Sequence, residues 1–187
     1  MDRRGFFRAG VDMVYRGVAR ELHNRMGGNT SNWIRPPYAL DEGEFLQVCT
    51  RCDKCVDACP HDVIFTLPPR TGTRAQGTPA LDLLNKGCRL CADWPCVAAC
   101  EPGALKFPAT EEAEEHPLPR LAHVHINSST CLPYSGPECG ACAASCPVPG
   151  TLVWHGTRPE IEPGQCTGCG LCREACIVEP KAVEIRV

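Results

Sequence analysis

The chain has 187 residues, of which 16 are cysteine, and its formal net charge at pH 7 is −3. The charge gives no basic excess that would indicate nucleic-acid binding, and no apolar stretch is long enough to predict a transmembrane helix. Because 17 glycines and 18 prolines accompany an aromatic content of only 6%, something besides hydrophobic burial must hold the chain together.

Residues 1–38 predict an amphipathic helix followed by a proline-containing linker. Apolar residues recur along one helical face, at Phe7, Val11, Val14, Val18 and Leu22. Arg3 and Arg4 look like the core of a twin-arginine export signal, but charged residues interrupt the apolar region that such a signal needs. We therefore expect a cytoplasmic protein whose N-terminal helix packs on its own chain or on a subunit. Peripheral membrane or partner docking through residues 1–26, and genuine export, are the alternatives.

The cysteines fall into four groups of four, with none left over. They are Cys49, Cys52, Cys55 and Cys59; Cys88, Cys91, Cys96 and Cys100; Cys131, Cys139, Cys142 and Cys146; and Cys166, Cys169, Cys172 and Cys176. The first group, followed by Pro60, has the spacing C-x2-C-x2-C-x3-C-P, which is the bacterial ferredoxin pattern for [4Fe–4S] ligation. The fourth group keeps this spacing, while the second and third each widen one gap.

This spacing has a local physical reason. Three thiolates on one tight loop can face the same side of a cuboidal cluster, and the x3 step carries the fourth thiolate toward a different cluster. Gly168 and Gly170 allow backbone amides to approach the sulfurs of the fourth group, where N–H···S bonds tune the potential. Glu101 and Ile177 stand where proline is expected after the second and fourth groups, which loosens the local turn without removing a ligand.

Two other uses of sixteen cysteines, disulfides and zinc sites, are alternatives to iron. A disulfide framework requires an oxidising compartment and a cleaved signal peptide, which the N-terminal sequence does not support. Zinc sites with four cysteines usually combine two separated C-x2-C knuckles, not three cysteines in one loop. Four [4Fe–4S] clusters would use all sixteen thiols, and we expect these four clusters as the cofactors.

Short strands are expected between and after the cysteine groups, because β-branched and apolar residues gather there. Their ranges are 63–67, 80–84, 104–107, 151–154, 160–162 and 182–187. Each half thus repeats a cysteine loop, a hairpin, a second cysteine loop and a closing strand. We predict an α+β fold of two tandem bacterial-ferredoxin-like modules, residues 39–107 and 121–187, joined by an acidic proline-containing linker at 108–120.

The ligand sets follow if neighbouring groups exchange their fourth cysteine, as in two-cluster ferredoxins. Cluster 1 would take Cys49, Cys52, Cys55 and Cys100; cluster 2 would take Cys88, Cys91, Cys96 and Cys59; cluster 3 would take Cys131, Cys139, Cys142 and Cys176; cluster 4 would take Cys166, Cys169, Cys172 and Cys146. A nested arrangement, which pairs the first group with the fourth and the second with the third, is the alternative. The hairpins within each half favour adjacent pairing.

The order and spacing of the four groups resemble the NapF/NapG/MauM family of ferredoxin-type proteins. The resemblance covers about residues 30–187 and includes Ile34-Arg35-Pro36-Pro37, Cys49-Thr50-Arg51-Cys52 and Cys166-Thr167-Gly168-Cys169. Members of this family are encoded beside periplasmic nitrate reductase and methylamine dehydrogenase. In its N-terminal character the chain is closest to the cytoplasmic NapF type.

These observations predict an electron carrier or an electron-transfer subunit, not an enzyme in its own right. Fully thiolate-ligated clusters have no open iron position for a substrate and pass single electrons. The expected partner is a larger redox enzyme, and the resemblance includes molybdenum enzymes among the candidates. Trp94 and Trp154 are expected to shield clusters from water. The alternative function, implied by the NapF resemblance, is an accessory factor that docks on a molybdoenzyme precursor during its maturation.

Overall fold

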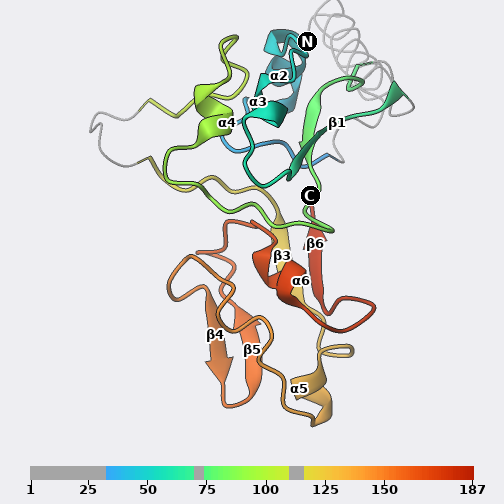
Figure 1. Cartoon of the computed structure of the whole chain (residues 1–187). Helices are drawn as coiled ribbons and strands as arrows, with labels where there is room; N and C mark the ends of the chain where they lie inside the picture. The colour runs from blue at the N-terminus through green and yellow to red at the C-terminus, as the bar shows by residue number, and fades with distance from the viewer. Residues whose placement is uncertain (1–32, 70–73, 110–115) are drawn as a thin grey trace, which may run out of the picture. The chain divides into compact units, whose positions relative to one another are not determined.

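The structure is a computed structural model that describes residues 33–69, 74–109 and 116–187 (Figure 1). The expected N-terminal helix lies outside these described residues. The described residues form short helices and short strands joined by long loops, in agreement with a mixed α and β class. No helix among them is long and apolar enough to cross a membrane.

The secondary-structure elements of the described residues are short, at most seven residues each. The helices are α2 (Glu42–Val48), α3 (Lys54–Asp57), α4 (Pro95–Ala98), α5 (Leu132–Ser135) and α6 (Leu171–Ala175). The strands are β1 (Ile64–Thr66), β2 (Pro79–Leu81), β3 (His123–Ile126), β4 (Leu152–His155), β5 (Arg158–Ile161) and β6 (Val183–Arg186).

Within the described ranges, the strands form three two-stranded antiparallel sheets. Strand β1 pairs with β2, with Ile64 opposite Leu81, and β4 pairs with β5, with Leu152 opposite Ile161. These two pairs confirm the strand pairing expected between consecutive cysteine groups. Strand β3 pairs with β6, so the beginning and the end of the segment 121–187 lie side by side.

The strand expected at residues 104–107 is wrong. Only Leu105 makes a β-bridge there, with Ala39. Two hydrogen bonds flank the bridge, from Leu40 N–H to the Ala104 oxygen and from Lys106 N–H to the Tyr38 oxygen. Prolines in the pairing segment and the positive φ of 56° at Tyr38 prevent a longer ladder, because proline lacks an N–H donor. The β3–β6 ladder has no proline and extends over four residue pairs.

Three of the short helices begin at a residue in the left-handed conformation. Asp53 precedes α3 with φ 59°, Trp94 precedes α4 with φ 42°, and Gly170 precedes α6 with φ 80°. Each helix contains the third cysteine of its group, and the fourth cysteine follows just after its last turn. The left-handed residue therefore marks the point where the cysteine loop turns into the helix.

The largest hydrophobic core surrounds Phe45 and includes Leu83 and Val97, all nearly inaccessible to solvent. Ala122 belongs to the same core, and Ile185 packs against it. Residues that follow the expected linker thus share a core with residues that precede it. This core fixes the cysteine loops at its margins.

Candidate metal centres

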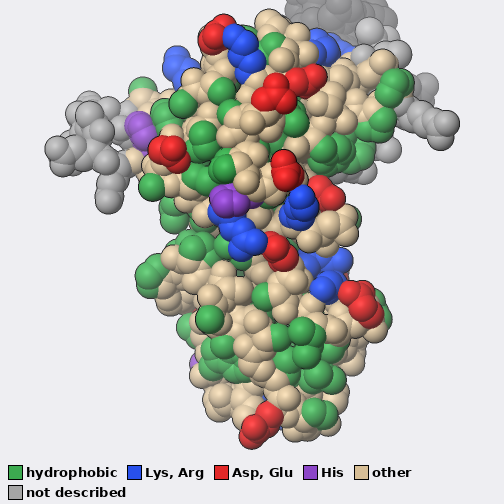
Figure 2. Space-filling model, in the orientation of Figure 1, with side chains coloured by type: hydrophobic (Ala, Val, Ile, Leu, Met, Phe, Trp, Pro, Cys, Tyr) green, Lys and Arg blue, Asp and Glu red, His purple; other side chains and the backbone are tan. Residues whose placement is uncertain are grey.

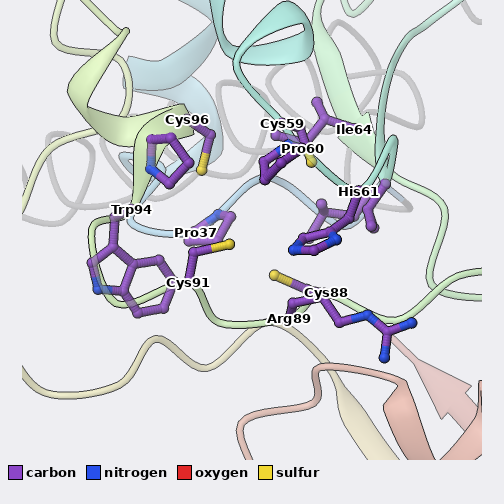
Figure 3. A pocket seen from close by; sticks show the side chains of 13 residues that line it. Pro37, Cys59, Pro60, His61, Ile64, Cys88, Arg89, Cys91, Trp94 and Cys96 are labelled. Atoms are coloured by element: carbon purple, nitrogen blue, oxygen red, sulfur yellow. The ribbon is translucent and has the colours of Figure 1, made fainter.

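Four cavities, each with a volume of about 330 to 380 Å³, are lined by four cysteines apiece. Cavity 1 is lined by Cys49, Cys52, Cys55 and Cys100; cavity 2 by Cys59, Cys88, Cys91 and Cys96; cavity 3 by Cys131, Cys139, Cys142 and Cys176; cavity 4 by Cys146, Cys166, Cys169 and Cys172. Each of the sixteen cysteines therefore lines one of these four cavities. Figure 3 shows cavity 2, with the cysteine side chains gathered around a common space.

Each cavity receives three cysteines from one group and one from the neighbouring group along the chain. These are the same four sets that adjacent pairing predicts. Nested pairing would bring the first group beside the fourth, and none of the four cavities does so. The lining supports the expected ligand sets, and the identity of the iron ligands stays a prediction.

Backbone geometry directs amide groups at the first cysteine of three groups. Arg51, Leu90 and Gly168 each follow that cysteine by two residues, and their φ angles are 59°, 49° and 73°. The Gly168 N–H donates a hydrogen bond to the Cys166 Sγ atom at 3.4 Å. The N–H groups of Arg51 and Leu90 likewise bond Cys49 and Cys88. Such bonds stabilise negative charge on sulfur.

Sequence reasoning anticipated this geometry only in the fourth group, where glycine supplies the positive φ. Arg51 and Leu90 adopt the same backbone conformation although both carry a Cβ atom. The steric cost is about 1 kcal/mol at each residue. Their position in the sequence could have predicted this positive φ, because both residues lie two places after the first cysteine of a group. The third group, with its long first gap, lacks this feature, and turns replace the helix at 141–144.

Burial makes the cavities unfavourable for bare thiolates. Burial first, and the charge of neighbouring cysteines second, raise the pKa of Cys55, Cys96 and Cys172 to about 12. Cys52 differs because it is exposed, and an N–H bond from Lys54 lowers its pKa. Four thiolates can therefore gather in such a cavity only when bound metal replaces their protons.

The arrangement fits a multi-iron core better than the alternatives. All sixteen cysteines are free thiols, so none is committed to a disulfide. Among the described residues, no three histidine, cysteine or acidic side chains converge as a single metal ion requires.

Two buried polar atoms at the cavities lack a protein partner. Trp154 lines cavity 3 and its Nε1 atom makes no hydrogen bond, and Thr151 lines cavity 4 with its Oγ1 atom in the same condition. Buried donors are almost always satisfied in folded proteins. Both can donate to the sulfur atoms of a bound cluster, so these two residues fit an iron–sulfur core. Sequence analysis assigned Trp154 only a shielding role and did not identify Thr151.

A family model described as a 4Fe-4S dicluster domain matches residues 48–104. This range contains the first and second cysteine groups and the residues that line cavities 1 and 2. The match shows a ferredoxin-like two-cluster domain in this part of the chain.

Proteins named NapG and MauM are similar to most of the chain. The ferredoxin-type protein NapG of Haemophilus influenzae is 35% identical over 166 residues, which cover 81% of this chain and 58% of that protein. The methylamine utilization ferredoxin-type protein MauM of Methylobacillus flagellatus is 33% identical, covering 95% of this chain and 78% of its own length. The chain thus spans little more than half of the NapG relative.

A NapF protein is also similar to most of the chain. The ferredoxin-type protein NapF of Escherichia coli is 32% identical over 159 residues, which cover 82% of this chain and 86% of that protein. All three relatives are described as ferredoxin-type proteins.

Proposed function

Because this chain belongs to the family of ferredoxin-type proteins that includes NapG, MauM and NapF, we propose that it relays single electrons through four [4Fe–4S] clusters to or from a larger oxidoreductase. The family supports an electron-transfer role for an iron–sulfur protein. The relay, the number of four clusters and the partner enzyme are our proposal.

One observation carries this proposal: sixteen cysteines line four cavities in sets of four. When bound, each cluster accepts and releases one electron. Each cavity has four thiols, one for each of the four iron atoms of a core. No iron atom therefore keeps an open ligand position for a substrate. Electron transfer without substrate chemistry is the role that such closed ligation allows.

We also propose two tandem modules, residues 39–107 and 121–187, joined by residues 108–120. Cavity 1 is lined from the first range, cavity 2 from that range and Pro37, and cavities 3 and 4 from residues beyond 120. The antiparallel pairs β1–β2 and β4–β5 occupy equivalent positions in the two ranges. The Ala39–Leu105 bridge and the β3–β6 ladder also occupy equivalent positions, because each joins the beginning of its range to the end.

Charge suggests how a partner would be recognised. Figure 2 shows basic and acidic side chains interspersed on the visible face. Four oxidised clusters with sixteen thiolates would add a formal charge of about −2 each. The loaded protein would then be far more acidic than the net charge of −3 from its side chains. We propose that this charge steers the chain toward a basic docking surface on the redox enzyme.

The proposed location is the cytoplasm, on the sequence argument that charged residues interrupt the apolar region required after Arg3 and Arg4. Fractionation of the native host, with antibodies to the full chain, tests this proposal. Recovery of a shortened chain from the periplasm would contradict it.

Purification of the tagged full chain from its native host, under anaerobic conditions, tests the function. We expect a redox enzyme to co-purify in stoichiometric amount, and its substrate to reduce or oxidise the clusters rapidly. The alternative function, maturation of a molybdoenzyme, predicts binding to the cofactor-free precursor and none to the mature enzyme. That second result would refute the relay.

A further inference from the structure

The two halves of the described chain meet at a pair of cysteines from different cavities. The Cys88 N–H donates a hydrogen bond of 2.7 Å to the Cys169 carbonyl oxygen. Cys88 lines cavity 2 and Cys169 lines cavity 4. Among the described residues, no other hydrogen bond joins a cysteine of the first two groups to one of the last two.

Several contacts hold these two cysteines together. The Glu174 carboxylate accepts a hydrogen bond from the Gly87 N–H at 2.8 Å and pairs with Arg89 at 2.9 Å. Arg173 donates from Nε to the Leu84 oxygen at 3.0 Å. A Cβ atom built on Gly87 would lie only 2.7 Å from the Leu171 Cα atom. The backbones of the two halves therefore touch directly beside the Cys88–Cys169 contact.

Within each half, the cavities are joined by cysteines four residues apart. Cys55 in α3 lines cavity 1, and Cys59, just after that helix ends, lines cavity 2. Cys172 in α6 lines cavity 4, and Cys176, which directly follows that helix, lines cavity 3. In each pair only four residues of chain, mostly helical, separate a cysteine of one cavity from a cysteine of the other. Cavities 1 and 2 are thus close neighbours, and so are cavities 3 and 4.

We propose that electrons cross the chain in the cavity order 1–2–4–3, and that the Cys88–Cys169 contact is the passage between the two halves. This order rests on the proposed relay function and specifies its path. Cavities 1 and 3 are the two ends of the path, where electrons enter from or leave to partners. The order differs from the order of the cysteine groups along the sequence.

The step across the contact is a single-electron transfer. The electron leaves the cluster beside Cys88, which is oxidised by one electron, and reduces the cluster beside Cys169 by one. The reverse direction has the same balance. No bond forms or breaks, and no proton or further reactant is needed within the chain. Electron tunnelling falls steeply with distance, so the shortest contact between the halves carries the transfer.

A pair of equivalent ligand substitutions tests the order. Cys52→Ala and Cys91→Ala each remove the second cysteine of a group, and each should lower the iron content from about 16 to about 12. Low-temperature electron paramagnetic resonance of the fully reduced proteins then reports which clusters remain magnetically coupled. In Cys91→Ala, cluster 1 loses its only neighbour, so an unsplit signal that integrates to one spin is expected. In Cys52→Ala, the three remaining clusters stay coupled and no such signal is expected.

The opposite pattern, or an isolated spin in both variants or in neither, overturns the proposed order. Such a result leaves the relay function intact as long as the wild-type clusters are reduced reversibly by one electron each. Failure to load iron into the wild-type chain would instead contradict the proposed function.

A second pair of variants decides the question if the ligand variants keep all their iron or fail to fold. Gly87→Leu forces the two backbones apart beside Leu171, whereas Gly43→Leu adds the same side chain where nothing lies within 4 Å. Gly87→Leu should keep about 16 irons but lose magnetic coupling between the two pairs of clusters. Gly43→Leu should match the wild type. Unchanged coupling in an iron-replete Gly87→Leu protein would overturn the Cys88–Cys169 passage.

Discussion

The Arg35 guanidinium group holds the Glu42 carboxylate through two hydrogen bonds, of 2.8 Å from Nε and 2.7 Å from an Nη atom. A further Nη atom donates to Thr78 Oγ1 and to the Pro79 oxygen, both at 2.8 Å. The Arg35 side chain is only 9% exposed and lies 4.7 Å from the centroid of the Phe45 ring. Arg35 thus joins the segment before α2, the helix itself and β2 around the largest core.

Arg35→Ala should destabilise the iron-loaded chain by about 3 kcal/mol, because it removes a buried guanidinium group and leaves the partly buried Glu42 carboxylate without its partner. Arg35→Lys should recover little, since lysine cannot reproduce the planar set of donors. Denaturant titration under anaerobic conditions, followed by loss of cluster absorbance, measures the effect. Arg186→Ala is the control, because the 3.4 Å pair of Arg186 with Glu184 is exposed and should contribute almost nothing. Equal midpoints for the two variants would contradict this role.

Trp154→Phe should lower the reduction potential of one cluster by some tens of millivolts. The indole N–H has no protein partner, and its donation to a cluster sulfur would favour the more negative reduced state. Potentiometric titration followed by electron paramagnetic resonance measures the shift. Trp33→Phe is the control because Trp33 lines none of the four cysteine cavities. Four unchanged potentials in Trp154→Phe would refute the donation.

Gly168→Ala should weaken or abolish the cluster bound by cavity 4. A Cβ atom there would lie 2.1 Å from the Ala122 oxygen, and φ is +73°, so the cost should be about 3 kcal/mol or more. Gly156→Ala is a matched control, since Gly156 has φ +66° but nothing within 4 Å of a built Cβ. It should cost only about 1 kcal/mol from backbone strain. Iron analysis compares the two, and full iron content in Gly168→Ala with normal stability would contradict the close approach.

The cysteine sets could be predicted because their cause is local. The spacing within a loop decides which thiols can face one cluster, and the hairpins favour exchange between adjacent groups. The strand pairs β1–β2 and β4–β5 followed from short runs of apolar and β-branched residues. The prediction of a strand at 104–107 was wrong because the segment that pairs with it contains prolines, which lack N–H donors. The sequence of residues 104–107 alone does not show this.

The Cys88–Cys169 contact lay beyond prediction from the sequence. It depends on how the halves pack, through Gly87 against Leu171, and no spacing rule connects residues so far apart in the chain. The left-handed conformations of Arg51 and Leu90 were also hidden, because only glycine signals a positive φ in a sequence.

Removal of iron should unfold the chain and not only bleach it. In the part of the chain that the structure describes, the hydrophobic clusters are small and the strands are no longer than four residues, so ligation supplies a large share of the folding free energy. Chelation in air, followed by far-ultraviolet circular dichroism and size-exclusion chromatography, should show loss of structure and an expanded chain. A compact, bleached protein would show that the core alone maintains the fold.

The most direct test of the account is the metal content of the anaerobically prepared full chain. Sixteen cysteines in four cavities predict a brown protein with about 16 irons and 16 acid-labile sulfides, in four clusters that each take up one electron. A colourless protein with about four zinc ions, or one with no metal and paired cysteines, would contradict the central claim.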